Sequence, residues 1–183
     1  MSAMFTAVSK FRTGYDQAQV EEFFSRARSV YEGSTQAEVT AATVREATFE
    51  LVRGGYATAT VDAALDRLEQ AFVARTRADV IASQGQQAWM GQLADQARTL
   101  YPRLSRPARK RFAPPAKGER GYHPDDVDEL CTRMVAYFDR GAALTSDDVR
   151  GATFRRKDGA GGYAEGPVDA FFSRAVEILL GVE

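Results

Sequence analysis

The chain has 183 residues, of which 44% are hydrophobic, and a formal net charge of −1. This length fits one domain or two small, closely packed ones, and the apolar fraction is enough for a hydrophobic core. The near-neutral balance excludes a global electrostatic attraction to nucleic acid or lipid, so any such contact must come from a local patch.

The sequence also lacks the signals of secretion and of membrane insertion. Its single cysteine cannot form an internal disulfide. No run approaches the roughly 20 apolar residues that span a bilayer, and the first residues do not have the charged and apolar regions of a signal peptide. We therefore expect a cytoplasmic protein.

The first predicted helix follows an irregular lead-in over residues 1–16. It runs over about 17–32, with Asp16 as its N-cap, because a carboxylate can accept hydrogen bonds from exposed backbone amides. Its apolar residues recur at helical spacing and are Val20, Phe23, Phe24, Ala27, Val30 and Tyr31. Three apolar positions per heptad favour a helix buried in a bundle over a two-stranded coiled coil.

Two short helices are predicted at equivalent places in the two halves of the chain. The first covers about 40–51 and ends at Gly54-Gly55. The second covers about 146–154 and follows Thr145, which has the capping-box spacing with Asp148.

A long helical stretch separates these halves. It begins near Thr60 and reaches Leu100, as one helix or as two in series with a bend near Gly85, and prolines at 102 and 107 end it. A basic connector over residues 101–120 follows. Its candidate patch consists of Arg103, Arg106, Arg109, Lys110 and Arg111.

Two further helices are predicted in the second half. One begins after His123, with Pro124 in its first turn, and the other begins near Pro167 for the same reason. No run alternates like a strand, so the predicted class is all-α.

Four short segments share one pattern. In each, a tyrosine preceded by glycine is followed five residues later by a valine and then by an acid, and an arginine stands six residues past the valine. The tyrosines are Tyr15, Tyr56, Tyr122 and Tyr163; the valines are Val20, Val61, Val127 and Val168; the acids are Glu21, Asp62, Asp128 and Asp169; the arginines are Arg26, Arg67, Arg133 and Arg174. Recurrence at fixed offsets indicates an internal repeat.

The four copies are also paired. Val44-Arg45-Glu46-Ala47-Thr48-Phe49 leads into the second copy, and Val149-Arg150-Gly151-Ala152-Thr153-Phe154 leads into the fourth. The same interval separates Tyr15 from Tyr122 and Tyr56 from Tyr163. The chain is therefore a duplicated unit, and each unit holds two copies.

These residues resemble the DivIVA family of bacterial cell-division and polar-growth proteins. The matching segments are Leu144-Thr145-Ser146-Asp147-Asp148-Val149, Phe154, Gly162-Tyr163 and Val168-Asp169-Ala170-Phe171-Phe172, together with Phe11-Arg12-Thr13-Gly14-Tyr15-Asp16, in which Thr13 is an insertion. The resemblance covers the chain except residues 80–108. Tandem copies in one short chain are similar to the DivIVA-repeat proteins of actinobacteria.

The resemblance implies an architecture. The family's N-terminal module is a dimer with intertwined loops, and two copies per unit can supply both partners within one chain. We therefore expect an all-α bundle of four DivIVA-like loop-helix motifs in two pseudo-dimeric pairs, with boundaries at 1–80 and 109–183, joined by a long helix and basic linker over 81–108. The family's C-terminal coiled coil has no counterpart here, so we expect a monomer or small homo-oligomer.

No constellation for catalysis, cofactor binding or metal binding is found. His123 is the only histidine and is expected at the surface, at a helix start. Cys131 occupies a core position of the repeat and is expected to be a buried thiol. The run Gly159-Ala160-Gly161-Gly162 lacks the lysine and hydroxyl residue of a phosphate-binding loop, so we expect a flexible turn.

The sharpest candidate contact is Phe11-Arg12. In the DivIVA family a Phe-Arg pair at the loop tip is the membrane contact, which implies that the Phe11 ring inserts while Arg12 meets lipid phosphate. Core packing of Phe11 is the alternative. An exposed aromatic beside a cation suits a membrane interface.

The repeated arginines and tyrosines also allow two interpretations. The arginines could bind a partner or phospholipid, but their stems are expected to cover the edge of the core while their heads pair with acids of the neighbouring repeat. Each tyrosine is expected to lock its loop onto its helix. The basic patch is expected to be a solvated connector, with attraction to anionic lipid as the alternative.

These observations predict a non-enzymatic adaptor or scaffold of the division or polarity machinery, with protein partners and peripheral contact to the inner face of the membrane. A compact protein-interaction module without membrane affinity is one alternative. A nucleic-acid-associated protein that uses the basic stretch 98–120 is another, although the near-neutral charge disfavours it.

Overall fold

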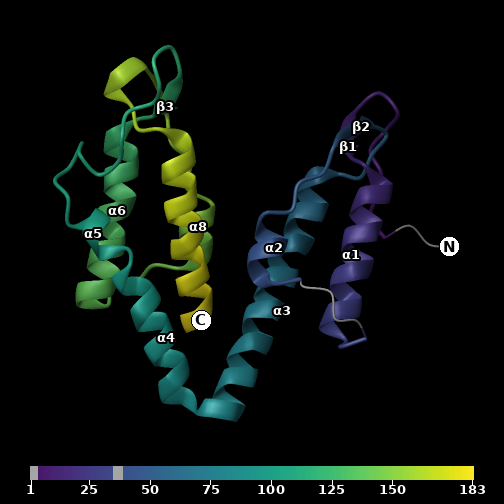
Figure 1. Ribbon diagram of the computed structural model, residues 1–183. Helices are drawn as coiled ribbons and strands as arrows, with labels where there is room; N and C mark the ends of the chain where they lie inside the picture. The colour runs from purple at the N-terminus through teal and green to yellow at the C-terminus, as the bar shows by residue number, and fades with distance from the viewer. Residues whose placement is uncertain (1–3, 35–38) are drawn as a thin grey trace. The chain divides into compact units, whose positions relative to one another are not determined.

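The computed structural model describes residues 4–34 and 39–183 and is mostly helical (Figure 1). It divides into two compact units, unit 1 over residues 1–79 and unit 2 over residues 80–183. The segment expected as a bridge, 81–108, therefore belongs to unit 2. Among the described residues, no helix is both long and apolar enough to cross a bilayer.

Unit 1 contains two loop-helix motifs that are joined by a short helix. Its elements are β1 (Thr13–Tyr15), α1 (Gln17–Tyr31), α2 (Ala41–Arg45), β2 (Leu51–Arg53) and α3 (Thr58–Gln84), which continues past the unit boundary. Asp16 is the N-cap of α1, as predicted, and its carboxylate accepts a hydrogen bond from the Gln19 amide at 2.9 Å. Strands β1 and β2 pair antiparallel, with Thr13 opposite Arg53.

Unit 2 repeats this order after two additional helices. Its elements are α4 (Gln86–Arg98), α5 (Tyr101–Leu104), β3 (Arg120–Tyr122), α6 (Pro124–Arg140), α7 (Ser146–Arg150), β4 (Arg156–Asp158), the 3-10 turn η1 (Gly159–Gly161) and α8 (Glu165–Val182). The predicted capping box is present, because Thr145 and Asp148 each bind the other's backbone amide. Strands β3 and β4 pair antiparallel, with Arg120 opposite Asp158.

The two short helices are shorter than predicted, and the mostly helical fold also contains two short two-stranded ribbons that the sequence did not predict. The first ends at Arg45 and the second at Arg150, after which the chain extends into β2 and β4. Within each unit, this second strand pairs with the first one: β2 pairs with β1, and β4 pairs with β3. Local propensity cannot reveal such pairing, because the partners are distant in sequence.

The long helical stretch consists of two helices in series, which is one of its two predicted forms. Gly85 adopts a left-handed φ of +88° between α3 and α4, where a residue with a Cβ atom would be strained. The stretch ends at Arg98, before Pro102, which lies in the first turn of α5. Helix α8 begins at Glu165, two residues before the predicted Pro167.

Each unit has its own hydrophobic core. In unit 1 the motif valines Val20 and Val61 are fully buried beside Tyr56. In unit 2 the additional helix α4 packs on the end of α8, where the buried Trp89 indole donates a hydrogen bond to the Gly181 carbonyl at 3.0 Å. A Cβ at Gly181 would lie 2.5 Å from a terminal methyl group of Leu93, so a side chain there would displace Leu93.

Candidate interaction site

The two Gly-Tyr segments of each unit cross in direct backbone contact. In unit 1 the Tyr15 and Tyr56 amides each donate to the other's carbonyl, at 2.9 and 2.8 Å. Tyr122 and Tyr163 do the same in unit 2, both at 2.9 Å. The preceding glycines allow this approach, since a Cβ on Gly14 would lie 2.2 Å from the Tyr56 oxygen.

The tyrosine hydroxyls then reach the helix of the other motif. Tyr163 donates to both carboxylate oxygens of Asp128 at 3.2 Å, and Tyr56 donates to Glu21. The corresponding pairs in the other direction are Tyr15 with Asp62 and Tyr122 with Asp169; burial first, and then the acid, raises the pKa of both tyrosines. We expected each tyrosine to lock its loop onto its own helix. Instead, the tyrosine hydroxyls join the two motifs of a unit.

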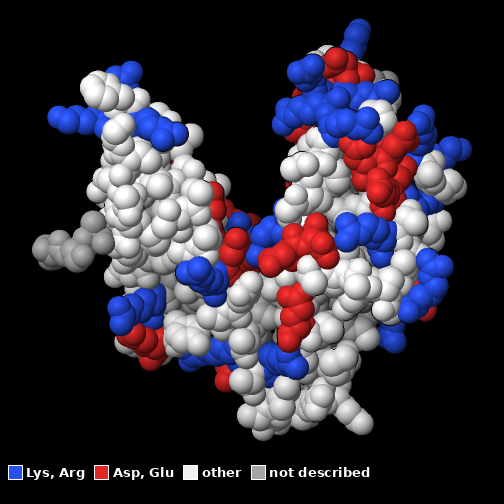
Figure 2. Space-filling model, turned by 180° about the vertical axis from the view of Figure 1, so that it is seen from behind, with Lys and Arg blue, Asp and Glu red and all other residues white. Residues whose placement is uncertain are grey.

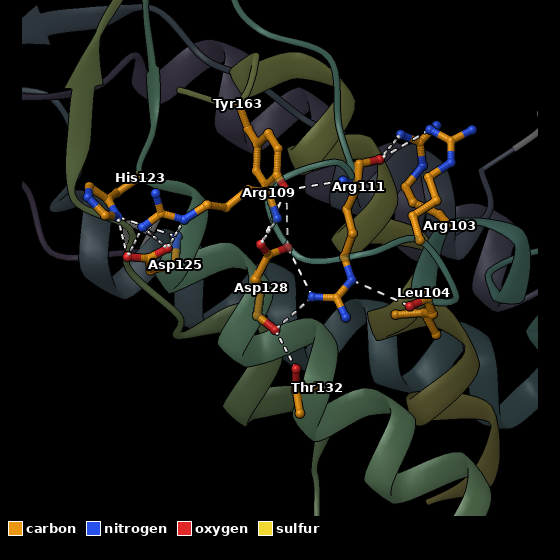
Figure 3. Close-up of polar contacts among 10 residues, drawn as sticks. Arg103, Leu104, Arg109, Arg111, His123, Asp125, Asp128, Thr132 and Tyr163 are labelled. Carbon is orange, nitrogen blue, oxygen red and sulfur yellow. Dashed lines mark hydrogen bonds and ion pairs between the residues drawn. The ribbon is translucent and has the colours of Figure 1, made fainter. Parts of the chain in front are cut away.

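Unit 2 surrounds its tyrosine–acid pair with a buried polar network (Figure 3). The Arg111 guanidinium is buried against Asp128, with Nη1 donating to Oδ1 at 3.0 Å, and the Arg111 amide donates to the Tyr163 hydroxyl at 3.1 Å. The Arg109 amide donates to Asp128 Oδ2 at 2.6 Å. The network therefore fixes the connector 103–112 against the start of α6.

Most residues of the predicted basic patch form contacts within unit 2. Arg103 lies 4.7 Å from the Phe112 ring centroid and, like Arg106, donates to the Arg111 carbonyl. Arg109 forms two hydrogen bonds with Asp125, at 2.8 and 2.9 Å, and Lys110 is exposed. Four of the five candidate cations therefore have contacts within unit 2, while the side chains of Arg106, Arg109 and Lys110 stay exposed.

The four motif arginines remain at the surface. Arg26, Arg67, Arg133 and Arg174 are all exposed. Arg133 lies 3.5 Å from Asp148 of α7, the helix that precedes the fourth motif. The Arg26 guanidinium carbon lies 5.7 Å from the centroid of the Phe23 ring, within range of a cation–π contact.

The end of unit 1 carries an exposed aromatic among cations. We define the unit 1 tip as Lys10, Phe11, Arg12 and Arg53. Phe11 is 92% exposed, which excludes core packing, and the three cations are exposed as well. Among residues 4–34 and 39–183, no ion pair involves any of these cations. Figure 2 shows blue and white side chains without red at this end, at the upper left.

The backbone presents Phe11 at the top of a tight turn. The Arg12 amide donates to the Ser9 carbonyl at 2.9 Å, and the Arg12 carbonyl accepts from the Gly54 amide at 3.0 Å. Residue 13, an insertion relative to the DivIVA pattern, is the strand residue opposite Arg53. The ribbon therefore brings Arg53, which sequence reasoning missed, to the same end as Arg12.

The remaining chemical candidates have structural roles. Cys131 is fully buried, and desolvation raises the pKa of its thiol to about 12. His123 caps α6, with its Nδ1 accepting a hydrogen bond from the Asp125 amide at 3.3 Å. Within the part of the chain that the structure describes, no group of three or more His, Cys, Asp or Glu residues could hold a metal ion.

Comparisons of this chain with protein-family models, with curated proteins and with solved structures give no match.

Proposed function

We propose that this protein is a non-enzymatic adaptor related to bacterial cell division or polar growth, which touches the anionic inner face of the membrane through the unit 1 tip. The observation that carries the proposal is the exposed Phe11 ring among three cations that form no ion pair within the described residues. The resemblance of the four motifs to DivIVA gives a second, independent reason, because the Phe-Arg pair of that family is its membrane contact.

The tip has the chemistry of a weak peripheral anchor. Burial of one phenylalanine ring contributes about 2 kcal/mol, and each cation near an anionic surface contributes about 1 kcal/mol. A single tip of this kind gives reversible binding and does not insert permanently. The membrane contact would therefore position the adaptor while other surfaces hold its protein partners.

Co-sedimentation with phosphatidylglycerol vesicles tests the proposal. The wild-type chain is expected to bind at low salt, and the double variant Phe11→Ala/Arg12→Ala is expected to lose most of this binding. Lys110→Ala, which removes an exposed cation of unit 2, is the matched control and should bind like the wild type. If the wild type does not sediment with these vesicles at low salt, the membrane role is rejected.

A protein-interaction module without membrane affinity is the second candidate. The exposure of the same arginine in all four motifs supports it, because arginine is enriched in protein interfaces. In that case, replacing Arg26, Arg67 and Arg174 by alanine would weaken partner capture without changing vesicle binding. The internal contacts of the basic connector disfavour the nucleic-acid alternative.

A further inference from the structure

Unit 2 has an end built like the unit 1 tip, and the backbone aligns the two residue by residue. The turn Ser9–Arg12 has its equivalent in a turn over 116–119, where the Glu119 amide donates to the Ala116 carbonyl at 3.0 Å. Both turns lead directly into the first strand of a ribbon. Phe11 therefore corresponds to Gly118, and Arg12 corresponds to Glu119.

The second strands align in the same way. Arg53 lies opposite Thr13 in unit 1, and Asp158 lies opposite Arg120 in unit 2. The position that adds a cation to the unit 1 tip is thus occupied by a carboxylate in unit 2.

Arginines at this end of unit 2 are bound by carboxylates. Arg120 Nε donates to Asp158 at 2.6 Å, and Arg156 donates to Glu165 at 3.2 Å. Arg155 Nε donates to Asp126 at 3.0 Å, and this contact holds the pKa of the carboxyl at about 2. Figure 2 shows red and blue side chains intermixed at this end, at the upper right.

The fold does not require these carboxylates, as the equivalent residues of unit 1 show. Asp126 accepts the Arg155 amide at 2.8 Å, and Gln19 accepts the equivalent Glu50 amide at 2.9 Å. A neutral amide therefore makes the same backbone contact. The additional effect of the carboxylate is to neutralise an arginine. Glu165 likewise corresponds to a neutral residue, Thr58, by its distance from the motif tyrosine.

We propose that the end of unit 2 is a masked counterpart of the unit 1 tip, in which Glu119, Asp126, Asp158 and Glu165 exclude anionic lipid, so that the chain holds the membrane through unit 1 alone. The inference rests on the proposed function. Two exposed lysines at this end, Lys117 and Lys157, form no ion pair among the described residues, so the cation equivalent to Lys10 is retained. An anionic surface that approached would nevertheless meet a carboxylate beside each arginine and no exposed ring, so repulsion would offset most of the attraction. Unit 2 is then available for protein partners while unit 1 is bound.

Transplanting the unit 1 residues into unit 2 tests the masking. The variant Gly118→Phe/Glu119→Arg/Asp158→Arg/Glu165→Thr is made in the Phe11→Ala/Arg12→Ala background, which is expected to retain little binding through unit 1. We expect its bound fraction on phosphatidylglycerol vesicles to rise at least fivefold over that background. A charge-matched control changes acids elsewhere, Glu22→Arg/Asp95→Arg/Glu32→Thr, and should leave the bound fraction unchanged.

The outcomes separate the two proposals. Loss of binding in Phe11→Ala/Arg12→Ala without recovery in the transplanted variant keeps the membrane role and overturns the masking. Equal recovery in the charge-matched control also overturns it, because net charge would then suffice. If circular dichroism shows that the transplanted variant does not fold, the variant Arg53→Asp in the wild-type chain is the second test. A carboxylate at this position should lower vesicle binding at least threefold. Unchanged binding would overturn the inference.

Discussion

At the scale of single residues, the Arg111–Asp128 pair is the most consequential polar contact of unit 2. Both side chains are buried, and Asp128 also accepts from Tyr163 and from the Arg109 amide. Removing one partner of a buried ion pair leaves the other uncompensated, at a cost of about 3–5 kcal/mol. The pair therefore constrains which changes unit 2 tolerates.

Arg111→Met is expected to lower the free energy of unfolding by about 3 kcal/mol, because Asp128 would be left in a buried site without its cationic partner. Urea denaturation followed by circular dichroism measures this change. Arg28→Met is the control, since the Arg28–Glu32 pair is exposed to solvent and its loss should leave the stability nearly unchanged. Similar costs for the two variants would contradict the assigned role of Arg111.

Cys131 gives a second test at this scale. The thiol is fully buried and its pKa is raised to about 12, whereas the thiolate is the reactive form. At pH 8 the folded protein should therefore resist a thiol reagent such as dithionitrobenzoate, and it should react stoichiometrically in urea. Rapid labelling of the folded chain would show that α6 opens.

At the scale of elements, the crossed Gly-Tyr segments define each unit. The hydrogen bonds between paired tyrosines leave no space for a side chain, and a Cβ on Gly121 would lie 2.2 Å from the Tyr163 oxygen. The crossing therefore explains the glycine before Tyr15, Tyr56 and Tyr122, whereas a Cβ on Gly162 would come no closer than 3.3 Å to its nearest neighbour, the Lys157 carbonyl oxygen.

Gly121→Ala is expected to destabilise unit 2 by on the order of 3 kcal/mol, because the ribbon must separate to admit a methyl group. Gly91→Ala in α4 is the matched control: its Cβ meets open space, and the higher helix propensity of alanine should raise stability by up to about 1 kcal/mol. Thermal unfolding measures both variants, and a neutral Gly121→Ala would refute the close crossing.

At the scale of the whole molecule, a chain with a net charge close to zero carries an exposed ring among cations at the unit 1 tip. Net charge −1 gives no general attraction to an anionic surface, so the membrane binding that we propose would depend on the unit 1 tip. Salt screens the electrostatic contribution of the cations to this binding, whereas it does not screen the hydrophobic contribution of the Phe11 ring.

Vesicle binding is therefore expected to fall several-fold between low salt and about 0.15 M salt, where the Debye length is about 8 Å. Flotation across a salt series measures this dependence. Phe11→Ala should lower binding at every salt concentration, whereas Arg12→Ala should flatten the dependence on salt. A salt-independent wild type would contradict a cationic contact.

The sequence alone determined the repeat, the helical class, the caps at Asp16 and Thr145 and the burial of the motif valines, and it offered a bend near Gly85 as one of two forms of the long helical stretch. These features depend on spacing and on local hydrogen bonding, which are written in neighbouring residues. It also singled out Phe11 and Arg12, but it left the exposure of the ring open.

Only the tertiary structure decided where the partners of these residues lie. The pairing of β1 with β2 ends the helix that the sequence extended to residue 51, and it brings Arg53 beside Thr13. The structure also sends the tyrosine hydroxyls to the opposite motif and binds Arg111 to Asp128. These contacts join residues far apart in the chain, and local patterns carry no information about which distant groups meet.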